Sequence, residues 1–189
     1  VFHLRNNNDE IKVIYNDPRR FGFMDLIPAD ELSTHKYFAN LGIEPTGNSL
    51  DGQLIADLFA NKKAPLKAAL LDQKLIAGLG NIYVCEALWH SGLLPTRAAN
   101  TVCTKNGKAT KRSTLLAGCV RDVIARAIDA GGSSLNDHRQ TDGTLGYFQH
   151  SFNVYDREGE NCRKDSCNGK IKRITQSGRS TYYCPRCQK

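Results

Sequence analysis

Apolar residues recur at helical spacing through the middle of the chain. The spacing predicts helices over residues 49–60, 82–91 and 113–130, and Pro65 opens a further short helical segment. Glycines follow the second and third helices directly, as is common at helix ends. The residues of the longest helix that we expect to point inward are Leu116, Val120, Val123, Ala127 and Ile128.

The first residues alternate between apolar and polar side chains, which predicts strands rather than helices. Residues 1–4 and 11–15 are expected to form two strands around a turn at Asn6–Asp9. The chain opens on Val1 without an initiator methionine or a signal-peptide core. Because an isolated hairpin is marginally stable, we expect these strands to belong to a larger sheet whose other strands lie upstream, in a longer or processed protein.

A second alternating stretch near the other end predicts a β-hairpin. Its strands are residues 170–174 and 180–183, with Gly178 at the tip and Arg179 just beyond it. Three further cations lie on this hairpin, which suits a phosphate backbone. Strands at both ends and helices between them predict an α+β fold.

The composition is that of an ordinary globular protein with an excess of basic residues. At 40% hydrophobic and 24% charged residues, wholesale disorder is excluded, and no apolar run approaches the roughly 20 residues that a membrane helix needs. The formal net charge is +7, of which +5 lies in residues 155–189. An anionic partner is therefore expected, with nucleic acid the first choice.

Four of the seven cysteines have the spacing of a zinc site. Cys162 pairs with Cys167 and Cys184 with Cys187, and sixteen residues separate the two pairs. Four thiolates on two short loops can surround one zinc ion, leaving no open position for a catalytic water. Two disulfides are the alternative, but the odd cysteine total and the absence of a secretion signal count against them. We expect the other three to be buried small side chains: Cys85, Cys103 and Cys119.

Three loops carry weaker signals. Gly78-x-Gly80 before a helix that begins near Asn81 could bind a phosphate, although such turns are usually only structural and the spacing excludes a Walker loop. The turn at residues 17–22 carries two arginines and Phe21, yet an exposed turn with Phe21 packed inward explains it as well. Residues 133–147 form a long polar segment without periodicity, which is usually functional or disordered.

Several of these segments share their sequence and their order with one known family. The matching pieces are residues 16–22, 41–45, 78–83, 131–135, 142–143, 146–148 and 178–188. Together they resemble the C-terminal two-thirds of formamidopyrimidine-DNA glycosylases, bacterial base-excision enzymes that remove oxidised purines. The chain departs from the family pattern in two places, because four residues rather than two separate Cys162 from Cys167, and Asp156 stands where glycine is usual.

The resemblance implies an architecture of three parts. Residues 1–40 would be the remaining strands of an N-terminal β-sandwich. Residues 41–152 would form a helix–two-turn–helix DNA-binding domain, and residues 153–189 a zinc-finger β-hairpin.

The resemblance also implies roles for individual residues. Gly80 and Asn81, together with Lys67, would bind DNA phosphates. Asn81 and Arg179 would clamp the phosphates that flank an everted nucleotide, with Arg179 also serving the elimination step, and Lys62 would contact the backbone further along.

Two further elements would act on the bases themselves. Phe21 would wedge into the base stack, and Arg19 would pair with the orphaned cytosine. A mobile loop would close over the extruded base, and its residues would be Thr141, Asp142, Gly143, Thr144, Gly146 and Tyr147.

The family uses an N-terminal proline amine as nucleophile and the adjacent glutamate as acid and base, and it cleaves the abasic site by β,δ-elimination. This chain opens instead with Val1-Phe2. For the full-length enzyme we therefore expect a bifunctional glycosylase and AP lyase acting on 8-oxoguanine and formamidopyrimidines. For the 189-residue chain we expect DNA binding without base excision.

Three alternatives stay open on the sequence. The first is an endonuclease VIII-like glycosylase acting on oxidised pyrimidines, which the arginines at 19 and 20 and the long 133–147 loop disfavour. The second is a non-catalytic zinc-hairpin module that binds DNA or RNA, and the third is a zinc domain for protein partners. The expected partner is duplex DNA with a damaged base or an abasic site, bound by a monomer in the bacterial cytoplasm near the nucleoid.

Overall fold

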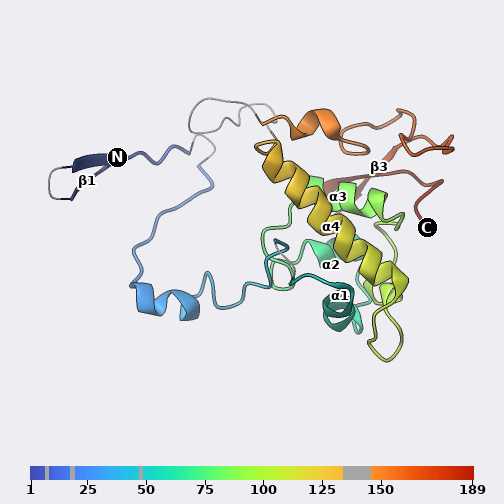
Figure 1. Cartoon of the computed structure of the whole chain (residues 1–189), viewed down its shortest axis with the longest axis horizontal. Coiled ribbons are helices and arrows are strands. Elements are labelled where there is room, and N and C mark those ends of the chain that lie inside the picture. The colour runs from blue at the N-terminus through green and yellow to red at the C-terminus, as the bar shows by residue number, and fades with distance from the viewer. Residues whose placement is uncertain (7–8, 18–19, 47–48, 134–145) are drawn as a thin grey trace. The chain divides into compact units, whose positions relative to one another are not determined.

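The computed structural model describes the chain except for residues 7–8, 18–19, 47–48 and 134–145 (Figure 1). The chain divides into two compact units, Val1–Ala39 and Asn40–Lys189. Among the described residues, no helix has both the length and the apolar character needed to cross a membrane.

The first unit contains the predicted N-terminal hairpin. Strand β1 (Phe2–Asn6) pairs antiparallel with β2 (Asp9–Val13), and Phe2 lies opposite Val13. A short 3-10 helix, η1 (Ala29–Thr34), follows. Every residue of the two strands is exposed, so within this unit neither face of the hairpin has a core to pack on.

The described residues of the second unit include four α-helices. They are α1 (Gly52–Phe59), α2 (Leu66–Leu70), α3 (Asn81–His90) and α4 (Lys111–Asp129). The three helices predicted from periodicity and the short segment after Pro65 are thereby confirmed, with ends shifted by up to three residues. Two 3-10 helices, η2 (Ala99–Val102) and η3 (Phe148–Ser151), lie before and after α4.

Side chains cap the first turns of α1 and α4. Asp51 accepts a hydrogen bond of 2.8 Å from the backbone N–H of Leu54 at the start of α1. Thr110 and Ser113 form a reciprocal capping box at the start of α4. Both α1 and α3 pack against the long α4 (Figure 1). The apolar core of this unit includes Ile55, Phe59, Leu70, Leu88, Leu116 and Val120.

One expected core residue of α4 is wrong. Leu116, Val120, Val123 and Ala127 are buried as predicted, but Ile128 is 64% exposed. Each residue turns the helix by about 100°, so Ile128 lies well to the side of the stripe that ends at Ala127. An apolar side chain that directly follows a periodic position can thus fall on the solvent face.

The C-terminal hairpin forms as predicted, two residues further along the first strand. Strand β3 (Lys172–Gln176) pairs antiparallel with β4 (Arg179–Tyr183), and Gln176 lies opposite Arg179. The turn between them consists of Ser177 and Gly178, with φ values of 49° and 74°. This two-residue turn with positive φ places Arg179 at the first position of the returning strand.

The three cysteines outside the paired set are only partly as expected. Cys85 on α3 is buried, whereas Cys103 and Cys119 are half-buried. Removal from water raises the pKa of all three thiols. Burial therefore disfavours the thiolate form of each of them.

Candidate nucleic-acid interface

The four paired cysteines converge on one point beside the hairpin. Their sulfur atoms all lie within 4.8 Å of one another, and the Sγ atoms of Cys162 and Cys187, and of Cys167 and Cys184, are 3.7 Å apart. Four sulfurs held at about 2.3 Å from a zinc ion at tetrahedral angles would be about 3.8 Å apart. The cysteines therefore fit one structural zinc ion, and four sulfur ligands leave no position for water.

Groups around the cysteines support this geometry. The indole N–H of Trp89, on α3, donates to Cys162 Sγ at 3.2 Å. Such a bond to a ligand sulfur orients it and offsets its negative charge. Gly169 lies so close that a Cβ atom added there would be 2.6 Å from Cys184 Sγ and 2.8 Å from Arg186 Cβ, which leaves no room for a side chain.

We expect Gly169→Ala to weaken zinc binding by about tenfold, because the added methyl group must displace Cys184 from the metal, and groups around a zinc site commonly affect affinity by about 10–100-fold. Competition with a metal chelator measures the change. Gly118→Ala is the control, since a Cβ atom at that position of α4 would meet nothing within 4 Å. Equal zinc affinity in the two variants would contradict this account of Gly169.

A buried carboxylate fastens the zinc-binding segment to the helices. Glu86 on α3 is 1% exposed. Its Oε1 accepts from the backbone N–H groups of Asn153, Val154 and Tyr155 at 2.9–3.0 Å, and its Oε2 accepts from the backbone and side-chain nitrogens of Asn153 at 2.9 and 3.0 Å. Because three consecutive N–H groups point at one carboxylate, the chain that leads into the zinc site has a fixed position against α3.

Two side chains from the helices hold the strand that carries Arg179. Lys67 of α2 donates from Nζ to the carbonyl oxygen of Ser180 at 3.2 Å and to Thr181 Oγ1 at 2.7 Å. Asn81, the first residue of α3, donates from Nδ2 to the same Ser180 carbonyl at 3.0 Å. The residue after Arg179 is therefore attached to both helices, and this fixes where Arg179 leaves the strand.

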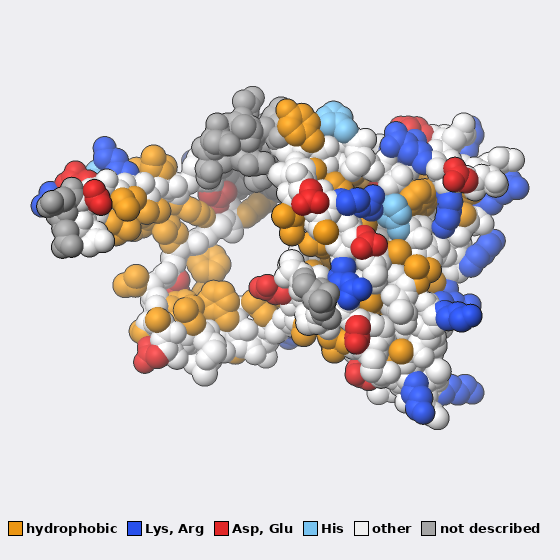
Figure 2. Space-filling model, viewed as in Figure 1, with side chains coloured by type: hydrophobic (Ala, Val, Ile, Leu, Met, Phe, Trp, Pro, Cys, Tyr) orange, Lys and Arg blue, Asp and Glu red, His pale blue; other side chains and the backbone are white. Residues whose placement is uncertain are grey.

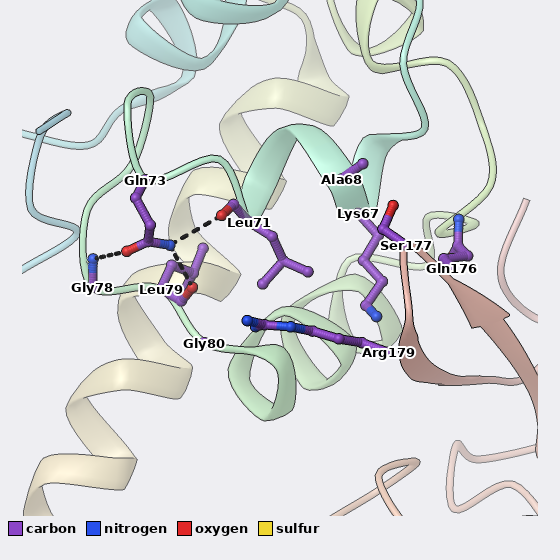
Figure 3. Close-up of a pocket in the computed structure, with 10 residues that line it drawn as sticks. All are labelled: Lys67, Ala68, Leu71, Gln73, Gly78, Leu79, Gly80, Gln176, Ser177 and Arg179. Carbon is purple, nitrogen blue, oxygen red and sulfur yellow. Dashed lines mark hydrogen bonds between the residues drawn. The ribbon is translucent and has the colours of Figure 1, made fainter. Parts of the chain in front are cut away.

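A pocket of about 370 Å³ opens between the helices and the hairpin tip. Figure 3 shows Arg179 extending from β4 across this pocket toward the turn at Gly80. On the other side, Gln73 supports the turn, because its Oε1 accepts from the Gly78 N–H at 2.8 Å and its Nε2 donates to the carbonyls of Leu71 and Leu79 at 3.0 and 3.2 Å. The lining residues are Lys67, Ala68, Leu71, Gln73, Gly78, Leu79, Gly80, Gln176, Ser177 and Arg179.

The pocket has the electrostatics of an anion site. Gly80 is the N-cap of α3 and contributes no capping side chain, so the first N–H groups of that helix have no intrahelical partner and carry its positive dipole end. The guanidinium of Arg179, which also lines the pocket, adds a full positive charge. Burial lowers the pKa of Lys67, Cys85 opposes this, and the positive charge of Arg179 lowers it further. A negative ligand would relieve this concentration of positive charge.

Four residues that sequence reasoning assigned to phosphate binding come together here. Lys67, Gly80 and Arg179 line the pocket, and Asn81 follows Gly80 directly. The Oδ1 atom of Asn81 is buried and accepts no hydrogen bond from any residue that the structure describes. Lys67 reaches the pocket with a side chain that is only 1% exposed, because its ammonium group is bound to the hairpin.

Three further predicted site residues of the described second unit do not line the pocket: Lys62, Gly146 and Tyr147. Lys62 is exposed ahead of α2 and does not line the pocket. Phe21 belongs to the first unit and is 80% exposed. Gly146 lies against the backbone of Gly132, where a Cβ atom would be 2.3 Å from the carbonyl oxygen, and Tyr147 is 67% exposed. The remaining predicted residues lie outside the described part of the chain: Arg19, Thr141, Asp142, Gly143 and Thr144.

Sequence reasoning missed three supporting residues. Gln73 and Trp89 carry no signal in the sequence, because their partners are a neighbouring turn and a cysteine 73 residues away. Glu86 could have been found, since it is the one acidic residue among the mostly apolar positions of α3. A buried carboxylate requires several hydrogen-bond donors. The helix itself cannot supply them, so a partner from another segment of the chain was to be expected.

Comparison with known proteins agrees with this geometry. Residues 41–139 match the formamidopyrimidine-DNA glycosylase H2TH domain, and residues 159–189 match the zinc finger found in FPG and IleRS. The zinc-finger match and the four-cysteine cluster together establish one structural zinc ion.

Individual relatives match over the whole chain. A formamidopyrimidine-DNA glycosylase of Chelativorans sp. (strain BNC1) is 64% identical over 100% of this chain and 64% of its own length, and that of Rhizobium meliloti (strain 1021) is 61% identical over 100% and 63%. This chain thus spans a little under two thirds of the curated relatives it matches.

Solved structures match as well. The MutM (Fpg) protein of Thermus thermophilus has a TM-score of 0.79 at 37% identity, covering 91% of this chain and 62% of its own. A complex of Lactococcus lactis Fpg with DNA containing an abasic site has a TM-score of 0.74 at 32% identity, covering 86% and 57%. With its helical domain, its zinc hairpin and the pocket between them, the chain belongs to the formamidopyrimidine-DNA glycosylase family.

Proposed function

We propose that this chain is the DNA-binding part of a base-excision repair enzyme. The whole enzyme would excise oxidised purines, such as 8-oxoguanine and formamidopyrimidines, from duplex DNA and cleave the abasic site by β,δ-elimination. The chain would have three parts: the remaining strands of an N-terminal β-sandwich (residues 1–40), a helix–two-turn–helix DNA-binding domain (41–152) and a zinc-finger β-hairpin (153–189). Because thiolates that bind zinc need a reducing compartment, we place the enzyme in the bacterial cytoplasm near the nucleoid.

The pocket between α2, α3 and the hairpin tip carries the proposal. A guanidinium group faces free N–H groups at a helix N-terminus across about 370 Å³. Guanidinium and helix N-termini both bind phosphate oxygens, the first as a planar donor and the second through its dipole. The guanidinium and the helix N-terminus can bind neighbouring phosphates of one DNA strand. They can thereby hold that strand in a bent conformation on either side of an extruded nucleotide, as base excision requires.

The proposed roles of the single residues differ in how they reach the DNA. Arg179 and the turn at Gly80 contact phosphates directly. Asn81 and Lys67 also hold Ser180 and Thr181, so that they place Arg179 as well as adding polar groups to the pocket. Lys62 contacts the backbone beyond it.

The remaining roles concern the base and the opposite strand. Phe21 would fill the space left by the extruded base, and Arg19 would pair with the orphaned cytosine. The loop that includes Thr141 and Tyr147 would close over the base. These roles rest on the family resemblance.

Arg179→Gln tests the proposal. We expect it to weaken binding to an abasic-site duplex by about 10–100-fold, because a hydrogen bond to a charged group contributes roughly 1.5–3 kcal/mol and about 1.4 kcal/mol is tenfold in affinity. Fluorescence anisotropy at fixed salt measures this.

Lys172→Gln is the matched control. It removes the same charge from an exposed position at the far end of the hairpin, opposite Tyr183. If the two variants bind equally, the loss comes from net charge alone, and the assigned role of Arg179 is wrong.

A further inference from the structure

We propose that a second basic surface, at the beginning of α4, binds the backbone of duplex DNA beyond the nucleotides held at the pocket. We call it the basic rim. It rests on the proposed function, because it extends the path of the same duplex. Its residues are Lys62, Lys63, Lys105, Lys108, Lys111 and Arg112.

Hydrogen bonds join the separate segments of the basic rim into one surface. The backbone N–H of Asn100 donates to the carbonyl of Lys62 at 2.9 Å. Gln53 of α1 donates from Nε2 to the Gly107 carbonyl at 3.0 Å and accepts from the Ala109 N–H at 3.0 Å. A Cβ atom at Gly107 would lie 3.6 Å from the Cβ of Ala60. The loop before α4 is therefore attached beside the turn that carries Lys62 and Lys63.

The cations of this surface form no ion pairs within the described part of the chain. All six are exposed, and no described acidic group forms an ion pair with any of them. No Asp or Glu occurs between Glu86 and Asp122. The nearby carboxylates on α1 are engaged by their own helix, since Asp51 accepts from the Leu54 N–H and Asp57 from Gln53 Nε2.

The charge of one rim residue acts on a further basic residue. Burial lowers the pKa of Arg97, and the charge of Arg112 lowers it further. Figure 2 shows Lys and Arg side chains gathered on the end of the molecule where α4 begins in Figure 1. A surface with several exposed cations that form no ion pairs attracts a polyanion, and regularly spaced phosphates can neutralise several of these cations at once.

The basic rim begins within reach of the duplex at the pocket. Lys63 precedes Lys67, a pocket residue, by four positions, and four residues span at most about 14 Å. Since each strand of B-DNA rises about 3.4 Å per base pair, this is roughly four base pairs. The near edge of the basic rim therefore lies at most about four base pairs along the duplex, and an arm that continues past this length would run over the rest of the rim.

The test compares the salt dependence of binding to duplexes with different arms. Each carries an abasic-site analogue with arms of about 4 base pairs, or with one arm lengthened to about 12. For the wild-type chain we expect lengthening of one arm, and not of the other, to make the plot of log K against log salt steeper. In Lys105→Gln/Lys108→Gln this extra slope should fall by about 2, because each neutralised phosphate contributes roughly 0.9.

Lys12→Gln/Lys36→Gln removes the same charge from exposed residues of the first unit and should keep the extra slope. The inference is overturned if Lys105→Gln/Lys108→Gln keeps the extra slope, or if the control variant loses as much of it. Arg179→Gln on the short duplex separates this from the proposed function, because it should weaken binding to a duplex that ends near the start of the basic rim. If Arg179→Gln binds the short duplex like wild type, the pocket assignment fails while the arm-dependent slope still reports on the basic rim.

Discussion

Removal of zinc is expected to abolish specific DNA binding while the helices remain folded. The zinc ligands belong to a small apolar cluster with Trp89, Ile171 and Tyr182, separate from the larger helical core. Structural zinc in small domains contributes about 10–16 kcal/mol of binding free energy to folding. Without it the hairpin should lose its order, and Arg179 would no longer be held across the pocket from Gly80.

Two readouts on the chelated protein check this result. Helical circular dichroism should change little, whereas the backbone amides of β3 and β4 should lose protection against hydrogen exchange. Affinity for an abasic-site duplex should fall by at least about 100-fold, since both the guanidinium and the hairpin backbone are displaced. Added zinc should restore both.

Cysteine variants provide the matched comparison. Cys184→Ser removes a ligand and should reproduce the effect of chelation, whereas Cys119→Ser alters a half-buried cysteine outside the cluster and should not. Protected hairpin amides and unchanged affinity after the metal has been removed would show that the hairpin folds without zinc.

Glu86→Gln is expected to lower the free energy of unfolding by about 3 kcal/mol. The carboxylate accepts from Asn153, Val154 and Tyr155 in a site that is 1% exposed. An amide of the same size replaces one acceptor oxygen with an NH₂ group, which faces N–H donors and leaves them without an acceptor. Breaking a buried charged network in this way typically costs about 3–5 kcal/mol.

Urea unfolding measures the change in Glu86→Gln. Glu158→Gln, at an exposed position shortly after the segment that Glu86 holds, removes the same charge without breaking a buried contact and should lie within about 0.5 kcal/mol of wild type. A loss below about 1 kcal/mol in Glu86→Gln would mean that the segment entering the zinc site is held by other contacts.

The parts of the fold that depend on residues close together in the sequence could be predicted. Zinc ligands on two short loops and a hairpin with Gly178 at its tip are local patterns, and they appear in the structure at the expected positions. Helices follow from periodicity in the same way. The periodicity gave a wrong prediction at Ile128, which is exposed. An apolar residue next to the buried stripe of a helix cannot be distinguished by its type from one within the stripe.

The arrangement of the pocket could be predicted only in part. The family resemblance implied that Lys67 binds phosphate, and the structure adds that its ammonium group binds the hairpin at Ser180 and Thr181. That contact joins residues more than 110 positions apart, and one partner is a backbone carbonyl, which no side-chain pattern reveals. Gln73 is hidden for the same reason, because it contacts backbone groups of the turn.

The central claim is that Arg179 and the first turn of α3 bind one stretch of DNA phosphates. A double-mutant cycle tests it, with Arg179→Gln as the protein change and a single uncharged methylphosphonate beside the abasic site as the DNA change. If the guanidinium contacts that phosphate, the second change should cost little once the first is made, with a coupling energy of about 1.5–3 kcal/mol at one flanking position. Additive losses at every flanking phosphate would contradict the account.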